Sequence, residues 1–185
     1  MNTESITPAD ILEYWYSEFM QKHWFASTPE LDAEIREKYQ SLWERAAAGE
    51  LDHWQDSPEG ALALVIVLDQ FPLNMFRGKP ESFRTERKAV DVTLSALKKG
   101  FEDRLSKDRL SFLFMPLMHS ERLEEQDLSV TLFRQYELTG NIKFAEHHRE
   151  LVRTYGRFPH RNAILGREST PAEMVYLASK DAFKG

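Results

Sequence analysis

The sequence contains no cysteine, and this absence excludes two kinds of chemistry. Neither a disulfide nor a metal site built on thiolates can form. A chain without disulfides is compatible with a reducing compartment, so we expect a cytoplasmic protein. There is also no HExxH pair and no Asp-rich calcium loop, and we therefore expect no metal site.

Long apolar runs are absent as well. The longest one, Ala61 to Leu68, is far shorter than the roughly 20 residues that a membrane-spanning helix needs. The first residues, Met1-Asn2-Thr3-Glu4-Ser5-Ile6, lack the basic and apolar regions of a signal peptide. We therefore expect no association with a membrane.

Positive charge is scarce, since the 185 residues carry a formal net charge of -6. This balance argues against a nucleic-acid-binding protein. A Gly-rich phosphate loop and a nucleophile elbow are also missing, and we expect no cofactor. The length fits one domain spanning residues 1–185, and a domain of this size buries roughly 70% of its unfolded surface.

The sequence does contain a succession of helix start signals. Thr7-Pro8, Thr28-Pro29 and Ser57-Pro58 each pair an N-cap residue with proline at the first helical position. Thr170-Pro171-Ala172-Glu173 adds the acidic residue of a full capping box. Apolar residues at helical spacing follow these signals, and no convincing strand alternation is present. We predict an all-α fold of about eight helices in antiparallel pairs.

The stretch from Ala61 to Leu68 has no polar face, which predicts a helix buried on all sides at the centre of the fold. Its β-branched residues make a buried strand the alternative, but the start signal and length favour a helix. Pro72 disfavours helical conformation at Phe71 and predicts that the helix ends near Asp69. Trp24 and Phe25, in an earlier connector, are expected to fill the core.

A local reversal of charge begins near the end of a helix predicted from Ile142 to Tyr155. No acidic residue occurs from Leu151 to Arg167, a stretch that holds His160, Asn162 and four arginines: Arg153, Arg157, Arg161 and Arg167. The guanidinium group offers a planar fork of donors that fits carboxylates and phosphates. This arginine loop, residues 156–168, predicts a polar site for an anion.

Polar residues also follow the central helix. Asp69 and Gln70 lie on its last turn, and Asn74 and Arg77 come after Pro72. A buried carboxylate needs a partner, for which arginine is the usual choice. Phe71-Pro72-Leu73-Asn74 is echoed by Phe158-Pro159-His160-Arg161-Asn162 in the arginine loop.

Two further groups place polar side chains where the pattern predicts core. His119 and Glu121 lie at a corner between helices, and Gln126 shares an inward stripe with apolar residues. His148 shares a stripe with Phe144, Leu151 and Val152 that leads into the arginine loop. Such a histidine is more often a core residue with its hydrogen bonds satisfied than a catalyst.

Three functions are compatible with these residues. The first is binding of an anionic small molecule, or of a peptide or protein carboxylate, by Asp69, Gln70, Asn74, Arg77, Gln126, His148, Arg157, Arg161, Asn162 and Arg167. The second is a hydrolase or lyase acting on a phosphate- or carboxylate-bearing substrate. In it, His119, His148 or His160 would transfer protons, and Glu121 or Asp69 would set a tautomer. The third is a purely structural network that joins helix ends.

The same stretches resemble a known family. Leu68-Asp69-Gln70-Phe71-Pro72, His119-Ser120-Glu121 and Gly156-Arg157-Phe158-Pro159-His160-Arg161-Asn162 are similar to motifs of the bacterial family known as domain of unknown function 924. The resemblance implies an all-α fold akin to tetratricopeptide-repeat proteins, and it implies no activity. The sequence departs from the family pattern at Leu73, where a basic residue is common, and at Leu117, where an aromatic residue is frequent.

Overall fold

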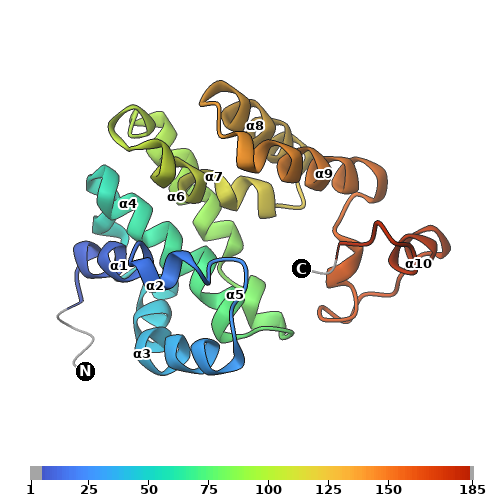
Figure 1. The fold of residues 1–185 in the computed structure, drawn as a ribbon, viewed down its shortest axis with the longest axis horizontal. Helices are drawn as coiled ribbons and strands as arrows, with labels where there is room; N and C mark the ends of the chain where they lie inside the picture. The colour runs from blue at the N-terminus through green and yellow to red at the C-terminus, as the bar shows by residue number, and fades with distance from the viewer. Residues whose placement is uncertain (1–5, 184–185) are drawn as a thin grey trace. The chain divides into compact units, whose positions relative to one another are not determined.

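The computed structural model describes residues 6–183 (Figure 1). The stretch used to predict the absence of a signal peptide lies, apart from Ile6, outside the described residues. Residues 6–183 contain helices and no strand, which confirms the all-α prediction. None of the described helices is both long and apolar enough to cross a bilayer.

The described residues form two compact units. Unit 1 comprises residues 6–77 and 81–116, and unit 2 comprises residues 78–80 and 117–183. The prediction of one domain over residues 1–185 stays a prediction. So does the tetratricopeptide-repeat-like arrangement.

Unit 1 contains most of the helices. Their bounds are α1 Pro8–Trp15, α2 Glu18–Gln21, α3 Pro29–Ala48, α4 Pro58–Val65, a π-helical turn η3 Ile66–Gln70, α5 Phe71–Met75 and α6 Glu86–Lys98. Short 3-10 helices lie at Asp52–Asp56, Pro80–Phe83 and Glu102–Arg104. Helix α7, Lys107–His119, begins in unit 1, whose last residue is Pro116.

Local capping explains where these helices begin. The hydroxyls of Thr7, Thr28 and Ser57 accept hydrogen bonds from backbone N–H groups in the first turns of α1, α3 and α4. Each helix has proline in its first turn, where the missing N–H costs nothing. The start signals in the sequence are therefore confirmed.

Helix α4 lies at the centre of unit 1, as predicted. Every residue from Gly60 to Pro72 is buried, and α4 packs against α1 and α6. Gly60 allows a close approach at the start of this helix, since a Cβ atom there would lie 2.1 Å from the Trp54 carbonyl oxygen. Only glycine fits such a contact without moving the backbone.

The prediction that Pro72 ends the helix was wrong. The chain stays helical through the π turn Ile66–Gln70 and into α5, with Phe71 at φ -57° and ψ -43°. The wider turn accommodates the proline ring, which in a regular α-helix clashes with the carbonyl four residues earlier. Pro116 likewise lies inside α7 without breaking it.

Two aromatic residues expected in the core are not equally buried. Trp24 packs against Phe112 with ring centroids 4.7 Å apart, and its Nε1 donates to the Trp15 carbonyl oxygen at 2.9 Å. Phe25, in contrast, is 78% exposed. The prediction for Phe25 was wrong, because a connector has no periodicity from which the inward direction can be inferred.

Unit 2 contains α8 Leu123–Gln135, α9 Thr139–Tyr155, the 3-10 turn η6 Pro159–Arg161 and α10 Pro171–Leu177. Helices α8 and α9 lie side by side (Figure 1) and are joined by a three-residue connection, so they form an antiparallel pair. Gly156, at φ 71°, ends α9 in the left-handed region. Leu151, Val152 and Phe158 form a small core near this end of α9, with Tyr155, Tyr176 and Phe183 packed against it.

Candidate functional site

The predicted site residues are divided between the two units. Asp69, Gln70, Asn74 and Arg77 belong to unit 1. Unit 2 holds His119, Glu121, Gln126, His148, Arg157, His160, Arg161, Asn162 and Arg167.

In unit 1, the Arg77 guanidinium pairs with Asp32 on the first turn of α3. Arg77 Nε donates to Asp32 Oδ2 at 2.7 Å and Nη2 donates to Oδ1 at 3.2 Å. Asn74 Nδ2 and Ser27 Oγ also donate to Asp32 Oδ1, each at 2.8 Å. Burial alone would raise the pKa of Asp32, but these hydrogen bonds lower it overall. Two predicted binding residues thus act together on a carboxylate of the protein itself.

Asp69 and Gln70 lie on the π turn and are buried. Gln70 Nε2 donates to Asp69 Oδ2 at 2.6 Å and also contacts Met115 Sδ at 3.4 Å. The adjacent amide is therefore one partner of the Asp69 carboxylate. The expectation that an arginine pairs with Asp69 stays a prediction.

In unit 2, Arg157 of the arginine loop pairs with Glu173 of the α10 capping box. Arg157 Nε and Nη2 donate to the two carboxylate oxygens of Glu173 at 2.7 and 2.8 Å. Thr170 N and Asn162 Nδ2 also donate to Glu173 Oε2, at 2.7 and 3.2 Å. The hydrogen bonds from Arg157 lower the pKa of Glu173 to about 2. The Glu173 carboxylate therefore joins the loop to the start of α10.

Arg167 makes an equivalent pair with Glu121. Its Nη1 and Nη2 atoms donate to Glu121 Oε2 and Oε1 at 2.7 and 2.9 Å, and Phe158 N donates to Oε1 at 2.8 Å. Burial tends to raise the pKa of Glu121, but Arg167 and the Phe158 N–H lower it overall. Arg167 Nε also donates to Asn162 Oδ1 at 3.0 Å. Glu121, proposed as a catalytic partner, thus anchors the loop in this structure.

The rest of the group is a histidine cluster, which we define as His119, His148 and His160 with Phe158 and Arg161. The Phe158 ring lies centrally, with ring centroids 5.3 Å from His148 and 5.6 Å from His160. The guanidinium carbon of Arg161 is 4.6 Å from the centroid of the same ring. Arg161 Nη2 donates to the His119 carbonyl oxygen at 2.8 Å. These contacts gather the side chains of His148, Phe158, His160 and Arg161 with the backbone carbonyl of His119 at the end of α7.

The imidazoles of His148 and His160 are neutral at pH 7. Burial lowers the pKa of His148 to about 3, and its Nδ1 lies 2.8 Å from the Phe144 carbonyl oxygen. This geometry fits an Nδ1–H donor. Burial, followed by the charge of Arg161, lowers the pKa of His160 to about 4. His160 Nδ1 is buried and has no hydrogen-bond partner.

Gln126 hydrogen-bonds the residues on either side of His119. Its Nε2 donates to the carbonyl oxygens of Met118 and Ser120 at 2.7 and 2.6 Å, which caps the end of α7. Its Oε1 atom is buried without a partner, as is the hydroxyl of Ser129 one turn later. The inward direction predicted for Gln126 is confirmed, since the residue is 0% exposed.

The arrangement can do limited chemistry on its own. Over residues 6–183, no group of three or more histidine, aspartate or glutamate residues could hold a metal ion. The charges of Arg161 and Arg167 lower the pKa of His160, and that of Glu121 raises it. Neutral imidazoles beside guanidinium groups can hydrogen-bond a ligand, and the arginine charges would attract one that is an anion.

Three contributors were missed from the sequence. Asp32 is an acidic residue one turn after an N-cap, and this position indicates helix capping rather than a tertiary partner. Glu173 was recognised as a capping residue, but nothing local to it signals a second role with Arg157. Phe183 contacts the His148 and His160 rings at 4.7 and 5.0 Å between centroids, and no motif marks it.

The sequence and the structure of the chain were compared with those of known proteins. No curated protein matches the chain. Among solved structures, the protein of unknown function ATU0120 from Agrobacterium tumefaciens is 34% identical and superposes with a TM-score of 0.85, covering 92% of this chain and 96% of that one. The sequence profile of the bacterial proteins of unknown function DUF924 matches residues 11–181. The chain belongs to this bacterial family, DUF924.

Proposed function

We propose that the histidine cluster of unit 2 binds a small anion, a carboxylate or a phosphate. The observation that carries the proposal is the buried Nδ1 atom of His160, which has no hydrogen-bond partner and lies beside Arg161. An unpaired buried polar atom costs about 1–3 kcal/mol. A ligand that hydrogen-bonds this atom would recover that energy.

The local charge supports an anion over a neutral ligand. The charges of Arg161 and Arg167 act on His160, as does that of Glu121. The Arg157 charge is balanced by its pair with Glu173. An anion at His160 would be attracted by the Arg161 and Arg167 guanidinium groups, and in a partly buried region this attraction is stronger than in bulk water.

The two alternatives find less support. A histidine acid or base works best with a pKa near the working pH, whereas those of His148 and His160 are about 3 and about 4. The structural alternative fits Arg157 and Arg167, whose forks hold Glu173 and Glu121. It gives no account of the unpartnered His160 nitrogen.

A thermal-shift screen of carboxylates and phosphates tests the proposal, with Arg161→Met as the test variant and Arg77→Met as its control. Both substitutions remove one arginine, but Arg77 belongs to the Asp32 pair of unit 1. At 100 times its dissociation constant a ligand stabilises the fold by about 2.7 kcal/mol, which raises Tm by about 5–10 °C for a chain of this length. We expect this increase in the wild type and Arg77→Met, and its loss in Arg161→Met.

The increase on ligand addition is the quantity compared, because Arg161→Met also removes a hydrogen bond to the His119 carbonyl and lowers Tm by itself. An anion that raises Tm equally in all three proteins would show that binding occurs elsewhere and would refute the proposal.

A further inference from the structure

The Phe183 ring lies against both neutral histidines of the cluster. Its centroid is 4.7 Å from that of His148 at an interplanar angle of 67°, and 5.0 Å from that of His160 at 75°. These are edge-to-face contacts, the arrangement that aromatic pairs prefer. Phe183 also packs on the apolar core of Leu151, Val152 and Phe158. The Phe183 ring is therefore in contact with apolar side chains and with the imidazoles of His148 and His160.

Within residues 6–183, a few backbone hydrogen bonds hold the segment that carries this ring. Phe183 N donates to the Tyr176 hydroxyl at 2.8 Å, and Ser179 N and Ala182 N make turn bonds at 2.9 and 3.4 Å. Lys180 and Asp181, which precede the ring, are exposed. Segments with few buried contacts open at a small cost in free energy. We therefore expect the ring to leave at a lower cost in free energy than unfolding the rest of unit 2.

We propose that Phe183 occupies a subsite for an aromatic ring, and that the ligand of the histidine cluster is an anion bearing such a ring, which displaces Phe183 when it binds. The inference rests on the proposed function and adds the ligand class. A phenyl ring on the ligand would take over the contacts of the Phe183 ring. Its carboxylate or phosphate would reach His160 Nδ1 and Arg161.

This arrangement separates two kinds of anion. A small anion such as acetate has no ring and does not compete with Phe183. An aromatic anion such as phenylacetate must first displace the ring, so its apparent affinity falls by the fraction of molecules in which the subsite is open. Removing the Phe183 ring should then strengthen phenylacetate binding and leave acetate binding unchanged.

The test compares wild type, Phe183→Ala and the control Phe144→Ala by NMR of the histidine side chains. The chain has 6 histidines, few enough to resolve. Phe144 is a 58% exposed phenylalanine of the same unit, and its backbone carbonyl, which the substitution keeps, contacts His148. The probes are acetate, which is an anion without a ring, benzyl alcohol, which is a ring without charge, and phenylacetate, which has both.

We expect Phe183→Ala to bind phenylacetate about three- to ten-fold more tightly than wild type. Benzyl alcohol should shift the His148 and His160 signals only in this variant. Phe144→Ala should match wild type. If acetate binds but the affinities for phenylacetate and benzyl alcohol are unchanged in Phe183→Ala, the aromatic subsite is wrong and the anion site stands.

The opposite failure has a different pattern. If neither acetate nor phenylacetate shifts the His160 signals in any of the three proteins, the anion site itself is wrong. Benzyl alcohol shifts confined to Phe183→Ala would then show a ring subsite without an anion site, which also overturns the proposed ligand class.

Discussion

Protonating His148 would place a positive charge where the protein has removed almost all water. The side chain is buried in the small core of unit 2, and its pKa is about 3. In the unfolded chain the same imidazole has a pKa of about 6.5. The folded state therefore binds fewer protons than the unfolded state between these two values. It follows that the stability of the fold decreases as pH falls from about 6.5 toward 3.

We predict that His148→Gln makes the fold less sensitive to pH across this range. The variant keeps a donor for the Phe144 carbonyl but cannot be protonated. Between pH 6 and pH 4 the free energy of unfolding of the wild type should fall by about 1 kcal/mol per pH unit more than that of the variant. Urea unfolding at pH 7, 6, 5 and 4 measures the difference. Parallel pH profiles for the two proteins would contradict a buried neutral His148.

For single residues, the sequence predicted which side chains are buried better than it predicted which residues form ion pairs. The stripe of Phe144, Leu151 and Val152 placed His148 inside, because helical periodicity alone determines which residues share a face. The partners of Arg77, Arg157 and Arg167 are Asp32, Glu173 and Glu121. They lie 16 to 46 residues away along the chain. Such distances are closed only by tertiary packing, on which local patterns carry no information.

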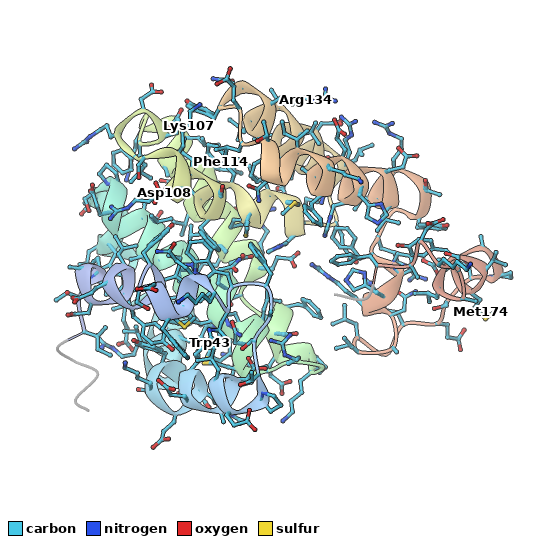
Figure 2. The ribbon with its side chains drawn as sticks, viewed as in Figure 1. Trp43, Lys107, Asp108, Phe114, Arg134 and Met174 are labelled. Carbon is cyan, nitrogen blue, oxygen red and sulfur yellow. The ribbon has the colours of Figure 1, made fainter. Side chains whose placement is uncertain are left out.

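Among the elements, the π turn between α4 and α5 shows how a helix accommodates proline. In a regular α-helix the Leu68 carbonyl would accept from the N–H of residue 72, but Pro72 has none. The Thr85 hydroxyl donates to this carbonyl at 2.5 Å. Thr85 Oγ1 in turn accepts from Trp43 Nε1 at 2.9 Å, and Figure 2 marks Trp43 among the side chains of unit 1. A side chain at the start of α6 thus replaces the missing backbone donor.

We predict that Thr85→Val destabilises the fold by about 2–3 kcal/mol, since it leaves the buried Leu68 carbonyl and the Trp43 N–H with one partner fewer. Thr131→Val is the matched control. The Thr131 hydroxyl bonds the Asp127 carbonyl within one exposed helical turn, so its loss should cost less than about 0.5 kcal/mol. Urea unfolding measures both values. Equal costs for the two variants would show that the Thr85 hydroxyl is not needed to satisfy Leu68.

Helix starts were predictable because capping is local, whereas the continuation of the central helix was not. Thr170 and Glu173 satisfy each other within three residues, as the capping box requires. The continuation past Pro72 depends on Thr85, 13 positions later in the sequence. A proline in sequence therefore shows where a backbone donor is missing, but the rest of the fold decides whether the helix ends there.

For the molecule as a whole, the lowered histidine pKa values found among the described residues, those of His148 and His160, both belong to unit 2. The pKa values of Asp32, Glu121 and Glu173 are lowered, so these carboxylates stay charged between pH 7 and pH 5. A change from pH 7 to pH 5 therefore acts on the stability of unit 2 through its histidines.

We predict that this change accelerates amide hydrogen exchange in α9 and the arginine loop more than in α4, after correction for the intrinsic exchange rate. The effect should be reduced in His148→Gln. Exchange followed by mass spectrometry at both pH values measures it. If α4 and α9 respond equally, the protein opens as one cooperative unit under these conditions.

Fold class and family could be inferred from the sequence, and the structure and the relative from Agrobacterium tumefaciens agree with both. The candidate site was predicted only in part. Its residue types and its arginine loop were identified, because charge and periodicity are visible in sequence. The sequence did not predict the carboxylates that pair with Arg157 and Arg167, or the ring of Phe183 beside His148. Each of these contacts depends on how segments distant in sequence pack together.

The bond from Thr85 to the Leu68 carbonyl also constrains how this sequence can change over evolutionary time. A chain in which Pro72 is replaced first regains a backbone N–H donor. Thr85 can then be substituted with little loss of stability. A chain that loses Thr85 first must pass through an intermediate with an unsatisfied carbonyl in its core. Changes at positions 72 and 85 are therefore expected to depend on each other during evolution. Related sequences that keep Pro72 should also keep Thr85 or another hydrogen-bond donor at that position.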